Sequence, residues 1–235
     1  MLAALLGGDL GRERADVERL QLLAHDVNNP LTAIRIIAEM LKDEAVDDQQ
    51  RDDMVDILES ADLVGLLLEG MTQLAQGADA SSFTWFPVPI ADLIRQAADR
   101  PALRAYVDLS ELEAVTIAGD RDALSRAFTD VMVNGRRLVA PRTKLGVRVA
   151  TVGDEVVITF HHPGDGIPES MRSWLFEADG PVRLREHQVP VATFGLAYAR
   201  EVARGHGGDI RLVSMEEGGM NLEISLSRTP PVGRR

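Results

Sequence analysis

Apolar residues recur at alternating steps of four and three positions in two runs within the first third of the chain. The first run comprises Leu20, Ala24, Val27, Leu31, Ile34, Ala38 and Leu41. The second run comprises Met54, Ile57, Ala61, Val64, Leu68, Met71 and Ala75. This heptad spacing is typical of helices that supercoil around one another. Because the polar residues 43–52 separate the runs, the pattern predicts an antiparallel helical hairpin over residues 10–76.

The apolar seams of such a hairpin need a partner, because two helices alone cannot enclose a core. We expect a second copy of the chain to supply that partner, which gives a dimeric four-helix bundle. The alternative is that both helices pack against the remainder of the same chain. The two arrangements predict different oligomeric states.

The pattern changes after a polar linker at residues 76–82, where short apolar runs alternate with amphipathic ones. Helices are expected at residues 90–99, 122–138 and 196–204. Strands are expected at residues 105–109, 114–118, 145–152, 156–161, 210–215 and 221–227, with hairpin turns at 153–154 and 217–219. Strands interleaved with helices predict an α/β sandwich over residues 83–228, in which helices cover one face of a mixed sheet.

Composition narrows the classes of function. The chain has 235 residues, with 25 Lys and Arg against 37 Asp and Glu, and a formal net charge of −12. Nucleic acid is not an expected partner, since phosphate contacts need clustered Lys and Arg. No long uncharged apolar stretch and no basic leader are found, so we expect no membrane span and a cytoplasmic protein. The chain lacks cysteine, and His161 and His187 lack partners at ligand spacing, so no metal site is expected.

Candidate chemistry is concentrated at residues 25–32, which read His-Asp-Val-Asn-Asn-Pro-Leu-Thr. His25 lies beside the first seam and points partly to solvent, and a neutral imidazole there is a nucleophile toward phosphorus. Asp26 can hold the proton on one ring nitrogen and leave the other nitrogen free to attack. Asn29 lies one turn later on the same face, where its amide could orient a phosphoryl group or a water. Pro30 cannot donate a backbone hydrogen bond, so we expect a bend that exposes His25.

The simplest interpretation of an isolated helical histidine beside a carboxylate is an exposed side chain that has no catalytic role. The complete string inside a heptad hairpin favours a phosphoacceptor instead, and residues 25–31 resemble the phosphoacceptor box of the two-component histidine kinase family. The resemblance extends over about residues 15–228. It implies that His25 is the phosphorylated residue, that Asp26 is its acid/base partner, and that Asn29 helps to dephosphorylate a response regulator.

The second domain resembles the ATP-binding domain of the same family. Asn134 matches the magnesium-binding asparagine of the asparagine box, and Arg137 falls where a basic residue often meets phosphate. Gly164 and Gly166 match the first glycine box, and Gly195 matches one glycine of the last box. The resemblance implies that these five residues bind nucleotide if nucleotide binding is retained.

Several positions depart from the family pattern. Asp130 stands where Asn or Glu is usual, and His162 replaces the Asp that accepts the adenine amino proton. A neutral histidine accepts through one nitrogen only, and a protonated one cannot accept at all. Within residues 191–197, Val191 and Thr193 replace glycines that let backbone N–H groups approach phosphate. These changes predict that ATP binding is lost or very weak.

The favoured interpretation is therefore a dimeric histidine phosphotransfer protein of a phosphorelay. It would carry a phosphoryl group on His25 between receiver-domain aspartates, of response regulators or of a hybrid kinase, without a cofactor. The first alternative is a soluble kinase that autophosphorylates His25 from ATP and Mg²⁺. The second alternative is a non-catalytic pseudokinase adaptor, against which the intact His25, Asp26 and Asn29 argue.

Overall fold

The computed structural model describes residues 2–76, 82–138, 143–163, 167–177, 180–189, 195–214 and 219–230. The chain divides into two compact units, Met1–Gly77 and Ala78–Arg235. Among the described residues, no helix combines the length and the apolar character that crossing a bilayer requires.

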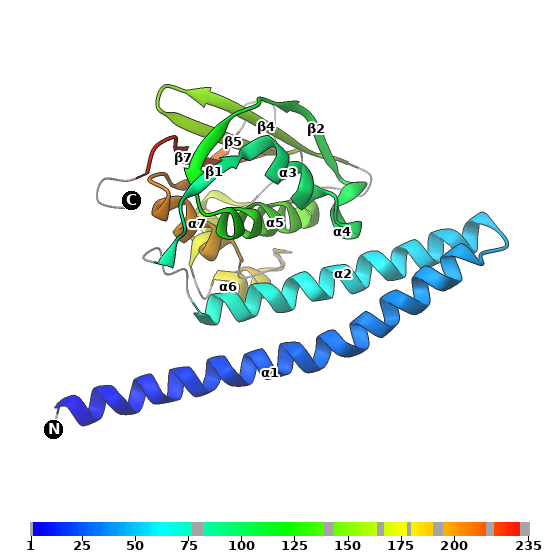
Figure 1. Ribbon diagram of the computed structural model, residues 1–235, viewed down its shortest axis with the longest axis horizontal. Helices are drawn as coiled ribbons and strands as arrows, with labels where there is room; N and C mark the ends of the chain where they lie inside the picture. The colour runs from blue at the N-terminus through cyan, green and yellow to red at the C-terminus, as the bar shows by residue number, and fades with distance from the viewer. Residues whose placement is uncertain are drawn as a thin grey trace. The chain divides into compact units, whose positions relative to one another are not determined.

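The first unit is the predicted helical hairpin, made of α1 (Leu2–Asp43) and α2 (Asp48–Gln76). Helix α1 runs through Pro30 without interruption and curves along its length (Figure 1). Helix α2 begins inside the polar stretch because Asp47 caps it, with its Oδ1 accepting the backbone N–H of Gln50 at 2.7 Å. The polar stretch is thus partly helical and not only a connection.

Many large apolar side chains of this unit stay exposed, and all of them except Val46 lie on α1 or α2. They are Leu22, Leu23, Ile34, Ile36, Ile37, Met40, Leu41, Val46, Val55, Ile57 and Val64. An accumulation of exposed apolar side chains of this kind indicates an interaction site.

The second unit is built on a five-stranded sheet with the strand order β2-β4-β5-β7-β6. Strand β2 pairs in parallel with β4, and the other neighbours are antiparallel. The strands are β2 (Val107–Leu112), β4 (Leu145–Val152), β5 (Glu155–His162), β6 (Ile210–Ser214) and β7 (Met220–Ser227). A second sheet pairs β1 (Phe86–Pro89) with β3 (Thr116–Gly119).

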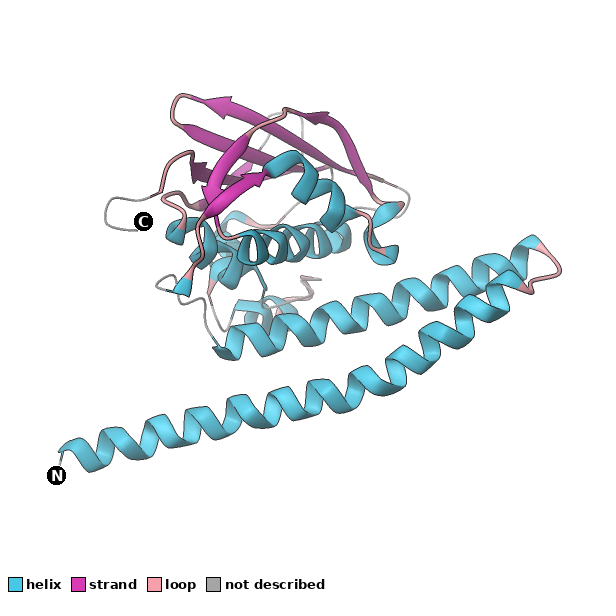
Figure 2. Cartoon of the chain, in the orientation of Figure 1, coloured by secondary structure: helices cyan, strands magenta, loops and turns pink. Residues whose placement is uncertain are grey.

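Helices cover one face of the large sheet, as the sequence predicts (Figures 1 and 2). The two that carry the candidate nucleotide site are α5 (Arg121–Leu138) and α7 (Gly195–Gly205). The other helices of this unit are α3 (Ile90–Ala98), α4 (Pro101–Arg104), the 3₁₀ helix η2 (Glu169–Phe176), which packs on α7, and α6 (Gly180–Glu186), which packs on η2.

Buried and less buried residues alternate along the central strands, which explains why this face of the sheet forms the core. In β5 and β7, every second residue is buried against the helices, as expected for a sheet with one covered face. The buried set of β5 ends at His162, so the alternation that builds the core also delivers a histidine to the edge of the candidate nucleotide site.

The expected strand at 105–109 begins only at Val107, because Pro101 starts a helical turn that carries the chain to Tyr106. Strand β1 was not predicted. It contains Pro87 and Pro89, which cannot donate to a sheet, and it pairs with one neighbour only. Neither η2 nor α6 was predicted, because each spans eight residues or fewer and carries little periodic signal.

Candidate phosphoacceptor and nucleotide sites

His25 projects from α1 into solvent. Its side chain is 72% exposed and that of Asp26 is 76% exposed, and His25 Nδ1 lies 3.5 Å from Asp26 Oδ1. A carboxylate on the Nδ1 side favours the tautomer with its proton there and leaves the Nε2 lone pair available to an electrophile. Asn29, one turn further along, is exposed as well. The three residues predicted to carry the chemistry therefore lie on accessible surface of one helix.

An apolar groove of about 350 Å³ lies between α1 and α2, further from the N-terminus of α1 than His25. Most of its lining belongs to the predicted seams, and it comprises Leu31, Ile34, Asp56, Ile57, Ser60, Ala61 and Val64. The hairpin thus does not close its own seam.

The second group of predicted residues lies around α5. Asn134 is buried, and its Nδ2 donates to the backbone carbonyl of Asp130 at 2.8 Å, which orients the amide. Arg137 follows on the same helix, but its side chain lies outside the described residues, as do Gly164 and Gly166. Of the predicted nucleotide residues, the structure thus places Asn134 and Gly195.

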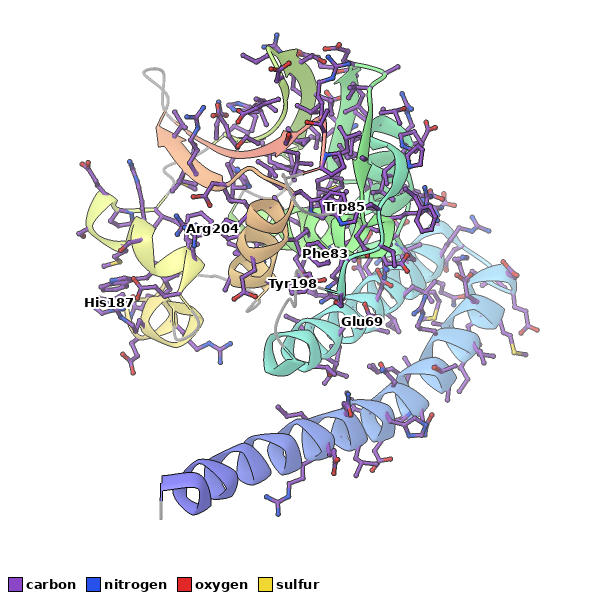
Figure 3. All side chains as sticks on the ribbon, turned by 60° about the vertical axis from the view of Figure 1, so that its left-hand side comes forward. Glu69, Phe83, Trp85, His187, Tyr198 and Arg204 are labelled. Atoms are coloured by element: carbon purple, nitrogen blue, oxygen red, sulfur yellow. The ribbon has the colours of Figure 1, made fainter. Side chains whose placement is uncertain are left out.

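Asp130 links α5 to the start of α7. Its Oδ2 accepts a hydrogen bond from Arg126 Nε at 2.9 Å, and both side chains are buried. The carboxylate also packs on Gly195, where an added Cβ would lie 2.5 Å from Oδ2. On the first turn of α7, burial and the charge of Asp130 raise the pKa of Tyr198 to about 12 (Figure 3). The start of α7 therefore faces an internal carboxylate whose counter-ion is Arg126, and the positive end of the helix dipole favours an anion there.

His162, at the end of β5, is 3% exposed and lies against α5. Its Nδ1 is 3.3 Å from the backbone oxygen of Met220, and because a carbonyl only accepts, Nδ1 carries the proton. Nε2 carries no proton and is left as an acceptor. An added Cβ on Gly135 would lie 2.5 Å from Nε2, so the ring occupies space that only glycine provides.

We predict that Gly135→Ala destabilises the second unit by about 1–3 kcal/mol, because the new methyl group meets His162 Nε2 at 2.5 Å and Leu145 Cδ2 at 3.0 Å. Urea unfolding would measure the loss. Gly65→Ala on α2 is the matched control, since nothing lies within 4 Å of that Cβ. Adding His162→Asn to Gly135→Ala should recover part of the loss, and strictly additive effects of the two substitutions would contradict the contact.

Stability should also depend on the protonation of His162. Burial lowers its pKa from 6.5 to about 4, against the opposing effect of the Met220 and Phe160 carbonyls. Between pH 6.5 and pH 4, His162 binds a proton in the unfolded chain but stays neutral in the native protein. The free energy of unfolding therefore falls as pH drops toward 4. The expected loss is about 3 kcal/mol. Unfolding measured between pH 7 and 4 should show this slope in the wild type, and it should flatten in His162→Asn.

An exposed histidine beside a carboxylate on a helical hairpin, followed by an α/β sandwich that buries an asparagine on a central helix, is the architecture of a histidine kinase core. Comparison with known proteins agrees. Residues 18–79 match the His Kinase A (phospho-acceptor) domain, and residues 119–230 match the histidine kinase-, DNA gyrase B- and HSP90-like ATPase family. The chain belongs to the two-component histidine kinase family.

Similar curated proteins include the sensor-type histidine kinase PrrB of Mycobacterium tuberculosis (strain H37Rv), 30% identical over 86% of this chain and 46% of PrrB. The histidine-protein kinase/phosphatase MprB of the same strain is 28% identical over 90% of this chain and 43% of MprB. AtoS of Escherichia coli is 24% identical over 93% of this chain and 37% of AtoS. The chain thus spans less than half the length of these relatives.

Solved structures share the fold. Full-length ShkA in complex with AMPPNP aligns with a TM-score of 0.58 at 21% identity, over 91% of this chain and 47% of ShkA. The mycobacterial sensor histidine kinase MprB aligns with a TM-score of 0.52 at 23% identity, over 63% of this chain and all of the MprB structure. They confirm the prediction of a helical hairpin followed by a histidine kinase-type sandwich.

Sequence reasoning missed two residues of the nucleotide region. Arg126 carries a detectable signal, since it precedes Asp130 by one helical turn, where opposite charges pair. Gly135 carries none on its own, because its role depends on a histidine 27 positions later that only the folded sheet brings to it.

Proposed function

We propose that this chain is the kinase core of a sensor histidine kinase, in which His25 takes a phosphoryl group from ATP and passes it to a receiver-domain aspartate. The observation that carries the proposal is the accessible imidazole of His25 with Asp26 at its Nδ1. The matches to both a phosphoacceptor domain and an ATPase domain support the kinase over the phosphotransfer protein that the sequence alone favoured.

His25 acts as the nucleophile. The Nε2 lone pair would attack the γ-phosphorus of ATP, so that an N–P bond forms, the bond from phosphorus to the bridging oxygen breaks, and ADP leaves. The proton on Nδ1 stays with the ring and is stabilised by Asp26, whose carboxylate carries the opposite charge. Bound ATP supplies the phosphoryl group. The exposure of His25 also leaves it open to the aspartate of a docked receiver domain, which takes the phosphoryl group in the second transfer.

The residues around α5 fit a nucleotide. Nε2 of His162 is a buried acceptor that packs against Gly135 of α5, and in the family the residue at this position accepts the adenine amino group. Asn134 offers an amide held in place by its bond to Asp130 and is the residue that we expect to hold Mg²⁺. His162 thus keeps the acceptor polarity of the carboxylate that the family uses there and loses its charge.

We further propose that the chain acts as a homodimer. The open groove along Leu31, Ile34 and Ile57 fits the matching groove of a second copy, which would complete a four-helix bundle. Response-regulator receiver domains are the partners that His25 requires. A molecular mass of twice the 25.6 kDa of the chain in light scattering would support the dimer, and a monomer would contradict it.

The phosphotransfer protein without ATP remains the second candidate. The observation that favours it is the pair of substitutions at the nucleotide site, where His162 lacks a negative charge and Asp130 engages Arg126. In that case His25 would be loaded only from a phosphorylated receiver.

One experiment separates the two. The purified chain is titrated with ATP in a calorimeter with and without Mg²⁺, and is then incubated with γ-labelled Mg-ATP. Saturable binding and acid-labile label on the chain support the kinase. Absence of both, with transfer from a phosphorylated receiver onto the chain, would support the phosphotransfer protein and overturn the kinase proposal.

A further inference from the structure

The imidazole of His206 joins the two helices that carry the nucleotide residues. It is completely buried just after the end of α7. Its Nδ1 donates to the carbonyl of Val202 in α7 at 2.7 Å, and its Nε2 accepts the backbone N–H of Asp120 at 2.9 Å. Because one nitrogen donates and the other accepts, the ring is neutral and its tautomer is fixed. One side chain thus bonds the last turn of α7 to the residue that immediately precedes α5.

Asp120 extends this bridge toward the connecting segment (residues 83–85), the stretch that leads into β1. Its Oδ1 accepts the N–H of Ala123 at 2.9 Å and so caps α5. Its Oδ2 accepts both the N–H of Thr84, at 2.8 Å, and the Thr84 hydroxyl, at 3.0 Å. The carboxylate therefore bonds the connecting segment and α5 at the same time.

The connecting segment also packs directly on His206. The ring centroids of Phe83 and Trp85 lie 4.9 Å and 5.1 Å from that of His206. Figure 3 shows both aromatic side chains on the stretch that leads into β1, with Tyr198 and Arg204 on α7. Phe83 and Trp85 thus contact the imidazole, and Thr84 between them contacts the carboxylate of Asp120, the residue whose backbone N–H the imidazole accepts.

The side chains around His206 are closely packed. A Cβ on Gly119 would lie 3.0 Å from Cδ2 of His206, 3.1 Å from its Nε2 and 2.9 Å from a methyl group of Leu124. Close-packed interiors transmit displacement because no void absorbs it. A shift of Thr84 would therefore move Asp120, and with it the first turn of α5 and its bond to His206.

We propose that His206 is a positioning residue that couples the connecting segment to the spacing of α5 and α7, and thereby to nucleotide affinity. The inference rests on the proposed ATP-dependent function. Asn134 lies on α5, and Gly195 begins α7, so both are held by the helices that His206 bridges. Coupling between two sites is reciprocal. Nucleotide binding must therefore favour one state of the connecting segment by the same free energy by which that state raises the affinity for nucleotide.

The sharpest test compares two threonines with the same bonding. Thr84 donates its N–H and its hydroxyl to Asp120, and Thr151 on β4 donates its N–H and its hydroxyl to Glu113, at 2.9 Å and 3.0 Å. In the full chain, Thr84→Val should weaken Mg-ATP binding about three- to tenfold, an effect of the size of one typical hydrogen bond. Thr151→Val should leave the affinity unchanged. Equal affinities of both variants and the wild type would overturn the coupling.

The fluorescence of Trp85 provides a second measurement. If His206 only stabilised the fold, Mg-ATP would not change this fluorescence. The chain has two tryptophans, so Trp174→Phe leaves Trp85 as the reporter. Its emission should change on addition of Mg-ATP and saturate with the calorimetric affinity. His206→Phe keeps a ring beside Trp85 but loses both hydrogen bonds, and it should abolish that change, while His206→Gln should retain part of it. An emission change that survives His206→Phe would overturn the inference.

Failure of the coupling and failure of the proposed function are distinguishable. Absence of Mg-ATP binding by the wild-type chain would overturn both together. Normal binding and phosphorylation of His25 in the wild type, with no difference between Thr84→Val and Thr151→Val, would overturn the coupling alone.

Discussion

Replacing His25 by glutamine is expected to abolish phosphorylation of the chain completely. Glutamine keeps a polar side chain of similar length, but its amide nitrogen has no lone pair available for attack on phosphorus. Because the His25 side chain is 72% exposed, the free energy of unfolding should change by less than about 0.5 kcal/mol. Acid-labile label from γ-labelled Mg-ATP, and from a phosphorylated receiver domain, measures the effect from both donors.

Asp26→Asn is the companion variant. It removes the charge opposite Nδ1 and leaves the nucleophile, so phosphorylation should slow by about 10²- to 10⁴-fold, the usual contribution of an acid/base group, and should not stop. The mass in light scattering should be the same for the wild type and both variants. Label that persists in His25→Gln would place the phosphoacceptor elsewhere and would remove the basis of the proposed function.

The hairpin could be predicted from sequence because its information is local. A heptad repeat needs only neighbouring positions to be recognised, and the exposure of His25 follows from its place beside the seam. Strands β4, β5 and β7 were predicted for a similar reason, since alternating residues mark a sheet with one covered face.

The contacts that shape the nucleotide region could not be predicted in the same way. Nothing in the sequence near Gly135 indicates that His162 will fill the space above it, and Asp120 and His206 are 86 positions apart. These contacts depend on how helices α5 and α7 lie on the sheet, which periodicity alone does not encode. The substitution at residue 162 was visible in the sequence, whereas the fixed tautomer of its ring and the packing of Nε2 against Gly135 became visible only with the fold.

Two of the departures from the family pattern, at His162 and Asp130, would act on different parts of a nucleotide under the proposed function. His162 keeps a hydrogen-bond acceptor and loses a charge, which weakens contact with an amino group without reversing its polarity. Asp130 keeps a charge but engages it with Arg126, beside the start of α7 where phosphate would be favoured. Because Glu also occurs at this position in the family, the carboxylate of Asp130 is not by itself an obstacle to ATP, and its engagement with Arg126 is the feature that bears on the phosphate site.

Breaking the Arg126–Asp130 pair should be among the most destabilising changes in the second unit. Arg126→Met leaves a carboxylate that is 2% exposed without this cation, and loss of one partner of a buried pair costs about 3–5 kcal/mol. Asp130→Asn leaves the buried guanidinium of Arg126 without the charge of Asp130, so we expect a similar loss of stability. The double variant Arg126→Met with Asp130→Asn removes both charges, and it should recover at least half of the loss, because no unpaired charge is left to desolvate.

The exposed pair Arg95–Asp92 is the matched control. Its atoms are also 2.9 Å apart, but its side chains are 53% and 69% exposed, so Arg95→Met should change stability by less than about 0.5 kcal/mol. Urea unfolding of the four variants would separate burial from charge pairing. If Arg126→Met cost no more than Arg95→Met, Asp130 would be solvated in the native protein. A solvated carboxylate would not hold the start of α7 as an internal anion, and that site would then be open to phosphate.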